Sequence, residues 1–166
     1  MAVGLIIIAI ILIVLLIVVI WFLSASKMTQ PAPETRYAIR LNSDQIIPLT
    51  SEPSDPSGST GLGQAILAAN EQSLKYNLMI QNLSSQISGA AIYQAASGHN
   101  GQHLKDLNYV QQGARAQLSG IWSYNDTPAL TSHIVNSLKT NQLYILIQTS
   151  NYPQGEIRGQ ILHLIQ

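Results

Sequence analysis

The sequence predicts an all-β domain, an antiparallel sandwich, preceded by one transmembrane helix. Of the first 23 residues, 22 are hydrophobic and none is charged. Beyond residue 23, short segments alternate apolar and polar residues between turn-forming residues, which is typical of about seven or eight antiparallel strands. The chain has no cysteine, which excludes a disulfide framework and thiolate metal sites. Its net charge of zero argues against a nucleic-acid partner.

Residues 1–23 form the expected transmembrane helix, and we expect it to remain as an uncleaved signal-anchor. The 22 residues 2–23 would span about 33 Å as a helix, close to the roughly 30 Å hydrocarbon core of a bilayer. The alternative is a signal peptide cleaved near Ser26, which would give a secreted protein. No Lys or Arg precedes the apolar run, and the run is longer than in most signal peptides. The few charges that follow leave the membrane orientation open.

Residues 24–34 contain Pro31 and Pro33 and are expected to form an extended linker, so the folded domain covers residues 35–166. Residues 73–82 give the clearest strand signal, since every second residue is apolar. The loops are expected at residues 48–63, 97–102 and 151–155, which are rich in Gly, Pro and small polar residues. Expected strands or apolar runs cover residues 36–41, 64–69, 73–82, 86–95, 107–110, 114–124, 142–149 and 156–165, and a short helix follows Thr131.

The end of the chain resembles the chordin-repeat (CHRD) domain family. Residues 143–149 read Leu-Tyr-Ile-Leu-Ile-Gln-Thr, and a Pro-x-Gly-Glu-Ile-Arg-Gly-Gln motif follows the next turn. Residues 41–48 echo the opening motif of the family, and the resemblance covers about residues 37–162. The residues that match the fixed positions of the closing motif are Pro153, Gly155, Glu156, Ile157, Arg158, Gly159 and Gln160.

The resemblance implies an immunoglobulin-like or Cu,Zn superoxide-dismutase-like β-sandwich. It also implies extracellular, envelope or viral contexts, and the family has no settled enzymatic activity. Three histidine positions of the family fall here on Ala91, Tyr93 and Gln148. Alanine has no donor atom, and tyrosine and glutamine are poor ligands for copper or zinc, so we expect no metal and no other cofactor.

Within the closing motif, Glu156 and Arg158 are two residues apart and would share one face of a strand. A structural role is favoured for them, either as a partly buried ion pair or as a hydrogen-bond clamp. Gly155 and Gly159 are expected to serve the backbone, one in a turn and one at a close approach between strands.

Two histidines give the alternative hypothesis of a superoxide-dismutase-like metalloprotein. His99 and His103 are four residues apart, with Asp106 nearby, but the surrounding glycines disfavour the helix that would put both ligands on one face. Ser132 and His133 are adjacent in sequence, which does not bring them into contact, and no nucleophile-elbow motif is present. We therefore expect an exposed loop at His99 and His103, and no enzymatic activity.

The sequence predicts a single-pass, membrane-anchored, non-catalytic binding or envelope-structural module. Its many amide and hydroxyl side chains suit a protein or carbohydrate partner, and the loops at residues 53–63 and 97–102 are the candidate contact regions. The expected location is the extracytoplasmic or the envelope or virion face of a membrane, in a bacterium or a large DNA virus. Asn82 and Asn125 begin glycosylation sequons at predicted turns.

Overall fold

The computed structural model describes residues 2–25, 33–48 and 57–164. The chain divides into two compact units, Met1–Ala32 and Pro33–Gln166. The first contains helix α1 (Ala2–Ala25), so the first two residues of the expected linker, Ser24 and Ala25, are helical. Residues 26–32 of that linker lie outside the described residues. In the part of the chain that the structure describes, no helix is long and apolar enough to cross a membrane.

The described residues of the second unit form nine strands, one α-helix and one 3-10 helix, and most of the expected strands are confirmed. The elements are β1 (Thr35–Leu41), η1 (Ser43–Gln45), β2 (Thr60–Leu67), β3 (Ser73–Gln81), β4 (Ile87–Gln94), β5 (Gln102–Asp106), β6 (Tyr109–Gln112), β7 (Arg115–Ser123), α2 (Ser132–Lys139), β8 (Leu143–Thr149) and β9 (Ile157–His163).

Two expectations about loops are wrong. Strand β2 begins at Thr60, inside the predicted loop of residues 48–63, of which residues 49–56 lie outside the described residues. Strand β5 was not expected, because its sequence contains a single apolar residue, Leu104, and therefore shows no alternation. Strand β5 is extended because it pairs with β4, and its own sequence does not predict this.

The all-β antiparallel class is confirmed, but the strands form one curled sheet. Their order is β5-β4-β8-β9-β1-β2-β3-β7-β6, and all neighbours pair antiparallel. An immunoglobulin-like or Cu,Zn superoxide-dismutase-like sandwich has two separate sheets. Here strand β9 links the two halves into one sheet. Its residues 157–160 pair with β8 and its residues 161–163 pair with β1, so it joins both halves of the ladder.

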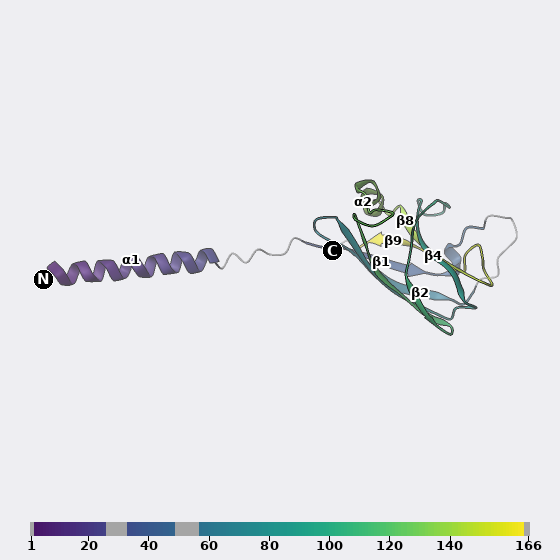
Figure 1. Ribbon diagram of the computed structural model, residues 1–166, viewed down its shortest axis with the longest axis horizontal. Coiled ribbons are helices and arrows are strands. Elements are labelled where there is room, and N and C mark those ends of the chain that lie inside the picture. Colours follow the sequence, from purple (N-terminus) through teal and green to yellow (C-terminus); the bar gives the residue numbers. More distant parts are fainter. Residues whose placement is uncertain (1, 26–32, 49–56, 165–166) are drawn as a thin grey trace. The chain divides into compact units, whose positions relative to one another are not determined.

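The sheet curls until its far strand approaches the opposite half (Figure 1). Gln111 of β6 accepts a hydrogen bond from Ile87 N at the start of β4 (2.8 Å) and donates one to Ser85 O (3.1 Å). Tyr109 of the same strand donates to Ile87 O (3.2 Å). These bonds satisfy backbone groups at the beginning of β4, where β5 does not reach.

The concave side of the curled sheet holds one apolar core. The alternation expected for β3 is confirmed, since Leu74, Tyr76, Leu78 and Ile80 are all buried in it. Trp122 of β7 is fully buried and donates from Nε1 to Pro128 O (2.8 Å). Both halves of the sheet contribute to this core, which is why they remain packed against each other.

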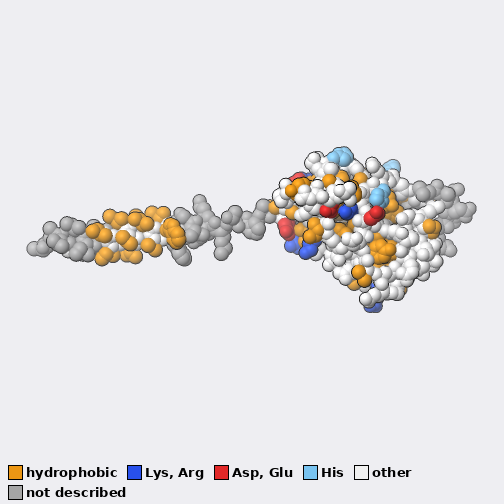
Figure 2. All heavy atoms as spheres, in the orientation of Figure 1, with side chains coloured by type: hydrophobic (Ala, Val, Ile, Leu, Met, Phe, Trp, Pro, Cys, Tyr) orange, Lys and Arg blue, Asp and Glu red, His pale blue; other side chains and the backbone are white. Residues whose placement is uncertain are grey.

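Helix α2 forms where the sequence predicts it and packs beside β9 (Figure 1). Thr131 caps it, because its hydroxyl accepts a hydrogen bond from Ile134 N (3.4 Å). Ile134 and Leu138, one turn apart, enter the core. Charged side chains are sparse over the visible surface of the folded unit, most of which is uncharged (Figure 2).

Candidate functional site

Glu156 lies immediately before β9 and is almost fully buried, with 1% of its surface exposed. Its carboxylate accepts hydrogen bonds from the Ser84 amide and hydroxyl (2.9 Å each), from the Thr149 hydroxyl (2.6 Å) and from the Ser59 hydroxyl. Ser59 precedes β2, Ser84 follows β3 and Thr149 ends β8. Together with the start of β9, the carboxylate therefore connects four segments at one end of the sheet.

The hydrogen bonds determine the charge state of Glu156. Burial works to raise the pKa of this carboxyl, but the bonds from Ser59, Thr149 and Ser84 together outweigh it and lower the pKa below its usual value. A buried carboxylate surrounded by donors is a stable structural anion. Glu156 does not line any of the three hollows described below.

Arg158 is also buried, with 2% of its surface exposed, but it does not pair with Glu156. Its Nη2 donates to His99 O (2.7 Å) and its Nη1 to Asn100 Oδ1 (3.1 Å). Its guanidinium carbon lies 3.6 Å from the centre of the Tyr144 ring. Burial lowers the pKa of Arg158, and the nearby Tyr144 acts in the opposite direction. The cation is therefore held by a carbonyl, an amide and an aromatic ring rather than by a carboxylate.

Tyr144 belongs to a row of side chains that crosses four strands on the outer face of the sheet. The register pairs His103 of β5 with Tyr93 of β4, Tyr93 with Tyr144 of β8, and Tyr144 with Gln160 of β9. The two tyrosine rings stack at 5.3 Å, and the His103 ring meets Tyr93 edge-on at 5.3 Å. Burial, and then Tyr144 and Asp106, raise the pKa of Tyr93, so its hydroxyl stays protonated.

Two hollows flank this row. The tyrosine hollow has a volume of about 250 Å³ and is lined by Ile47, Tyr93, Asn100, Gly101, Tyr144, Leu146, Gln148, Pro153 and Gln154. The Arg158 hollow has a volume of about 210 Å³ and is lined by Asp44, Gln45, Ile46, Ile47, Ser97, Gly98, Arg158 and Gln160. Both are formed where residues 97–101 lie against the segment after η1, and Asn100 joins the two sides by donating to Ile47 O (3.1 Å).

The three positions where the family resemblance expects histidine lie on this same outer face. Gln148 of β8 is opposite Gly89, and Ala91 and Tyr93 follow at two-residue spacing along β4. Tyr93 and Gln148 line the tyrosine hollow, and Gln148 Nε2 donates to Pro153 O (2.7 Å). Ala91 has no donor atom, so these residues do not fit a copper or zinc ion.

The alternative metal ligands do not converge. His103 contacts Asp106 (2.8 Å), whereas His99 contributes its backbone carbonyl to Arg158. Among the described residues, no group of three or more His, Asp or Glu side chains could hold a metal ion. His133 on α2 lies 3.3 Å from Gln94 Nε2.

The two glycines of the closing motif occupy constrained positions. Gly155 has a φ of +133°, which side chains rarely adopt, and it completes the turn before β9. At Gly159, an added Cβ would lie 2.1 Å from Arg40 O, so only glycine fits this approach of β9 to β1. The asparagines of both sequons are exposed: Asn82 follows β3, and Asn125 lies in the turn after β7.

Sequence reasoning identified the closing motif and the loop at residues 97–102, but it missed Tyr144 and the pairing of Arg158 with residues of that loop. Tyr144 alternates with buried Leu143 and Ile145, and this local pattern indicates only that it lies on the outer face. The signal that places it beside Tyr93 is the strand register, which involves residues about fifty positions apart.

Comparison with known proteins agrees with this architecture over most of the folded unit. The model of the CHRD domain family matches residues 37–161, from β1 to β9. No curated protein sequence matches the chain. No solved structure matches it either.

Proposed function

Since the chain belongs to the CHRD domain family, we propose that it is a membrane-anchored, non-catalytic binding module whose tyrosine hollow receives a neutral carbohydrate unit. The observation that carries the ligand class is the composition of the hollow, in which stacked Tyr93 and Tyr144 lie beside the amides of Asn100, Gln148 and Gln154. The Tyr144 ring is buried against Arg158 and Tyr93, so the contacts to a sugar fall to the half-buried Tyr93 and to the amide groups, which pair with hydroxyl groups.

The size and charge of the hollow support a small neutral ligand. Its volume of about 250 Å³ lies just below the usual range of about 300–1,000 Å³ for drug-sized ligands, which suits a single sugar ring. None of its lining residues is charged. Arg158 borders the adjoining hollow, but its guanidinium is already engaged by His99 and Asn100.

The absence of catalysis is part of the proposal. The buried carboxylate of Glu156 is saturated by hydrogen bonds, and neither hollow contains a serine beside a histidine. Ser132 and His133 lie on α2 and are not among the residues that line the tyrosine hollow. These observations support binding without chemical conversion of the ligand.

The proposed anchor is the uncharged apolar segment of residues 2–23. Its described side chains from Ile10 to Trp21 are all exposed on α1, so the helix offers apolar surface on every side. A tether to a membrane would raise the local concentration of the module, so that weak contacts to a sugar suffice. Alkaline carbonate extraction tests the anchor, and a mature N-terminus near Lys27 would contradict it.

The ligand is tested by screening the full chain in detergent against a panel of immobilised neutral glycans, and then measuring the affinity for each hit. Tyr93→Phe keeps the stacked ring and removes the hydroxyl, so it is expected to weaken binding by about tenfold. Tyr124→Phe is the matched control, because Tyr124 is an exposed tyrosine that does not line the hollow. A panel without any binder, or equal losses in both variants, contradicts the carbohydrate assignment.

The side of the membrane is tested by protease treatment of intact cells or particles that carry an epitope tag after Gln166. Loss of the tag without detergent is the expected result, since an extracytoplasmic location is proposed. Protection until detergent is added would contradict that location, and an interior protein serves as the control for intactness.

A further inference from the structure

A second surface lies on the outer side of the other half of the sheet. It is formed by outward-facing residues of β1, β2, β3, β7 and β6, which the register aligns in rows. We call this surface the basic face. The residues that define it are Arg36, Arg40, Leu62, Lys75, Met79, Val110, Gln112, Arg115, Gln117 and Ile121.

The charges on this face are all positive. Arg36, Arg40, Lys75 and Arg115 make up four of the eight Lys and Arg residues of the chain. No Asp or Glu alternates with them on the outward side of these strands. In the described structure, the ion pairs of lysine involve Lys105 and Lys139 instead. Among the described residues, no ion pair involves these four cations, so they give the face a positive potential.

An apolar row crosses the middle of the same face. Leu62 pairs with Met79 across β2 and β3, and Gln117 of β7 continues the row to Val110 of β6. The exposed fractions of the apolar members are 60% for Leu62, 49% for Met79 and 68% for Val110. Large aliphatic side chains at this exposure, gathered on one surface, are typical of an interaction site.

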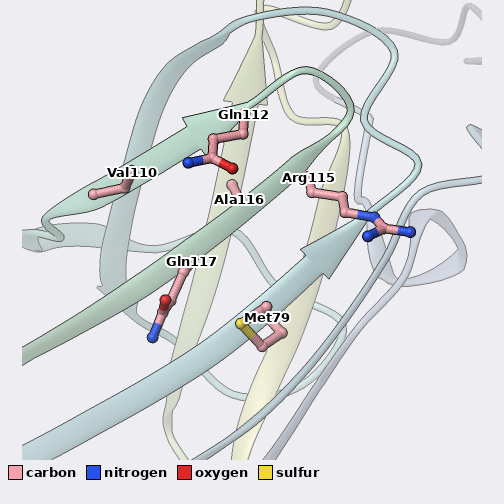
Figure 3. Close-up of a pocket in the computed structure, with 6 residues that line it drawn as sticks. All are labelled: Met79, Val110, Gln112, Arg115, Ala116 and Gln117. Carbon is pink, nitrogen blue, oxygen red and sulfur yellow. The ribbon is translucent and has the colours of Figure 1, made fainter.

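The row borders a hollow of about 270 Å³ (Figure 3). Met79 and Val110 supply apolar walls, while Arg115, Gln112 and Gln117 supply polar ones. The labelled side chains come from β3, β6 and β7, and Gln112 and Arg115 flank the turn that joins β6 to β7 (Figure 3). A cation next to an apolar wall matches the border between a phosphate headgroup and an acyl chain.

We propose that the basic face docks the folded unit flat on an anionic lipid surface. Cations attract the headgroups at roughly 1 kcal/mol each near such a surface, and the aliphatic row enters the boundary with the acyl chains. A nucleic acid or another soluble polyanion fits less well, since it would be bound through cations with stacking aromatic rings. The basic face carries aliphatic side chains instead of aromatic rings. The tyrosine of β6, Tyr109, donates its hydroxyl to Ile87 O and is not part of the face.

The position of the face along the chain agrees with this docking. The nine residues 26–34 between α1 and β1 reach at most about 30 Å when extended. Arg36 and Arg40 lie on the strand that follows immediately. The closeness of β1 to the bilayer rests on the proposed anchor, whereas the composition of the face does not depend on it.

The test uses the absence of cysteine from the chain. Val110→Cys in the full chain receives a single environment-sensitive fluorophore, and the protein is added to vesicles of phosphatidylcholine with or without about 30% phosphatidylglycerol. The expected result is a blue shift, with quenching by spin-labelled lipid, in the anionic vesicles alone. Salt at about 0.5 M should reverse it, because screening shortens the reach of the charges.

The control probe is Asn136→Cys, which lies on the exposed side of α2 and should not respond. Arg36→Gln, Arg40→Gln, Lys75→Gln and Arg115→Gln together should lower the docking equilibrium roughly a thousandfold, at about tenfold for each 1.4 kcal/mol. The matched variant carries Lys105→Gln and Lys139→Gln, cations outside the face, and should dock as the parent does. Circular dichroism establishes that each variant is folded.

Carbonate extraction of the same vesicles separates this proposal from the anchor. Retention of the chain with a silent Val110 probe overturns docking and leaves the anchor intact. Release of the chain with a responsive probe contradicts the anchor and supports docking. A probe that responds to soluble polyphosphate but not to vesicles overturns the lipid assignment.

Discussion

At the scale of single residues, two buried polar groups differ in how their hydrogen bonds are satisfied. Glu156 accepts four hydrogen bonds from three residues, which lower its pKa against the effect of burial. The hydroxyl of Tyr37 is buried and has no hydrogen-bond partner among the described residues. The first group should stabilise the fold strongly, and the second should cost stability, since an unsatisfied buried group loses its hydration without compensation.

Glu156→Gln should reduce the free energy of unfolding by about 2–4 kcal/mol, because the NH2 group of glutamine replaces one carboxylate oxygen, and each oxygen accepts two of the four hydrogen bonds. Urea unfolding of the full chain in detergent measures the change. Glu71→Gln, which removes a half-exposed charge paired with Lys139, is the control and should cost less than about 1 kcal/mol. Equal midpoints for the parent and Glu156→Gln would contradict the clamp.

The same carboxylate predicts a pH dependence. Because the folded state lowers the pKa of Glu156 from its ordinary value of 4.5, the unfolded chain takes up this proton first as pH falls. The stability from this group is complete above that ordinary pKa and is lost as pH drops through the lower folded value. Unfolding midpoints across acidic pH should show this loss in the parent and a smaller slope in Glu156→Gln.

Tyr37→Phe should leave the stability unchanged or raise it by up to about 1 kcal/mol, because it removes the unpaired hydroxyl and keeps the ring in the core. Thermal unfolding beside the parent chain gives the answer. A loss of more than about 1 kcal/mol would mean that the hydroxyl has a partner that the described structure does not contain.

At the scale of elements, β9 organises the sheet. It pairs with β8 through its first residues and with β1 through its last, and Gly159 lies at the point where the backbone of β1 comes closest. This arrangement lets one strand connect the half that carries the tyrosine row with the half that carries the basic face. A side chain at Gly159 would force these halves apart.

Gly159→Ala is expected to destabilise the fold by about 3 kcal/mol or more, because the new Cβ meets Arg40 O and the backbone must shift. Gly58→Ala is the control, since nothing lies within 4 Å of a Cβ at that position. Chemical denaturation compares the two variants. Similar midpoints for both would show that β9 can move away from β1 without cost.

At the scale of the whole molecule, one curled sheet presents two outer surfaces of different chemistry. The half around β4 and β8 carries stacked rings and amides, and the half around β2, β3 and β7 carries cations and aliphatic side chains. Both surfaces are supported by a single core that belongs entirely to the second unit of the chain. The folded unit therefore has what it needs to fold without α1.

A fragment of residues 33–166 should fold alone and unfold within about 2 °C of the full chain, because every core residue that the structure describes lies in the second unit. Differential scanning calorimetry makes the comparison in one detergent buffer. If the fragment is unfolded, or melts far below the full chain, then residues before Pro33 stabilise the domain.

The sequence by itself determined the all-β class, the boundaries of most strands, the helix after Thr131 and the family. These features are visible because alternation and capping depend on neighbours within a few residues. The tertiary structure decided the single curled sheet, the presence of β5, the separation of Glu156 from Arg158, and the stacking of Arg158 on Tyr144. These features depend on strand register and burial between segments far apart in the chain, and a local pattern carries no information about such distances.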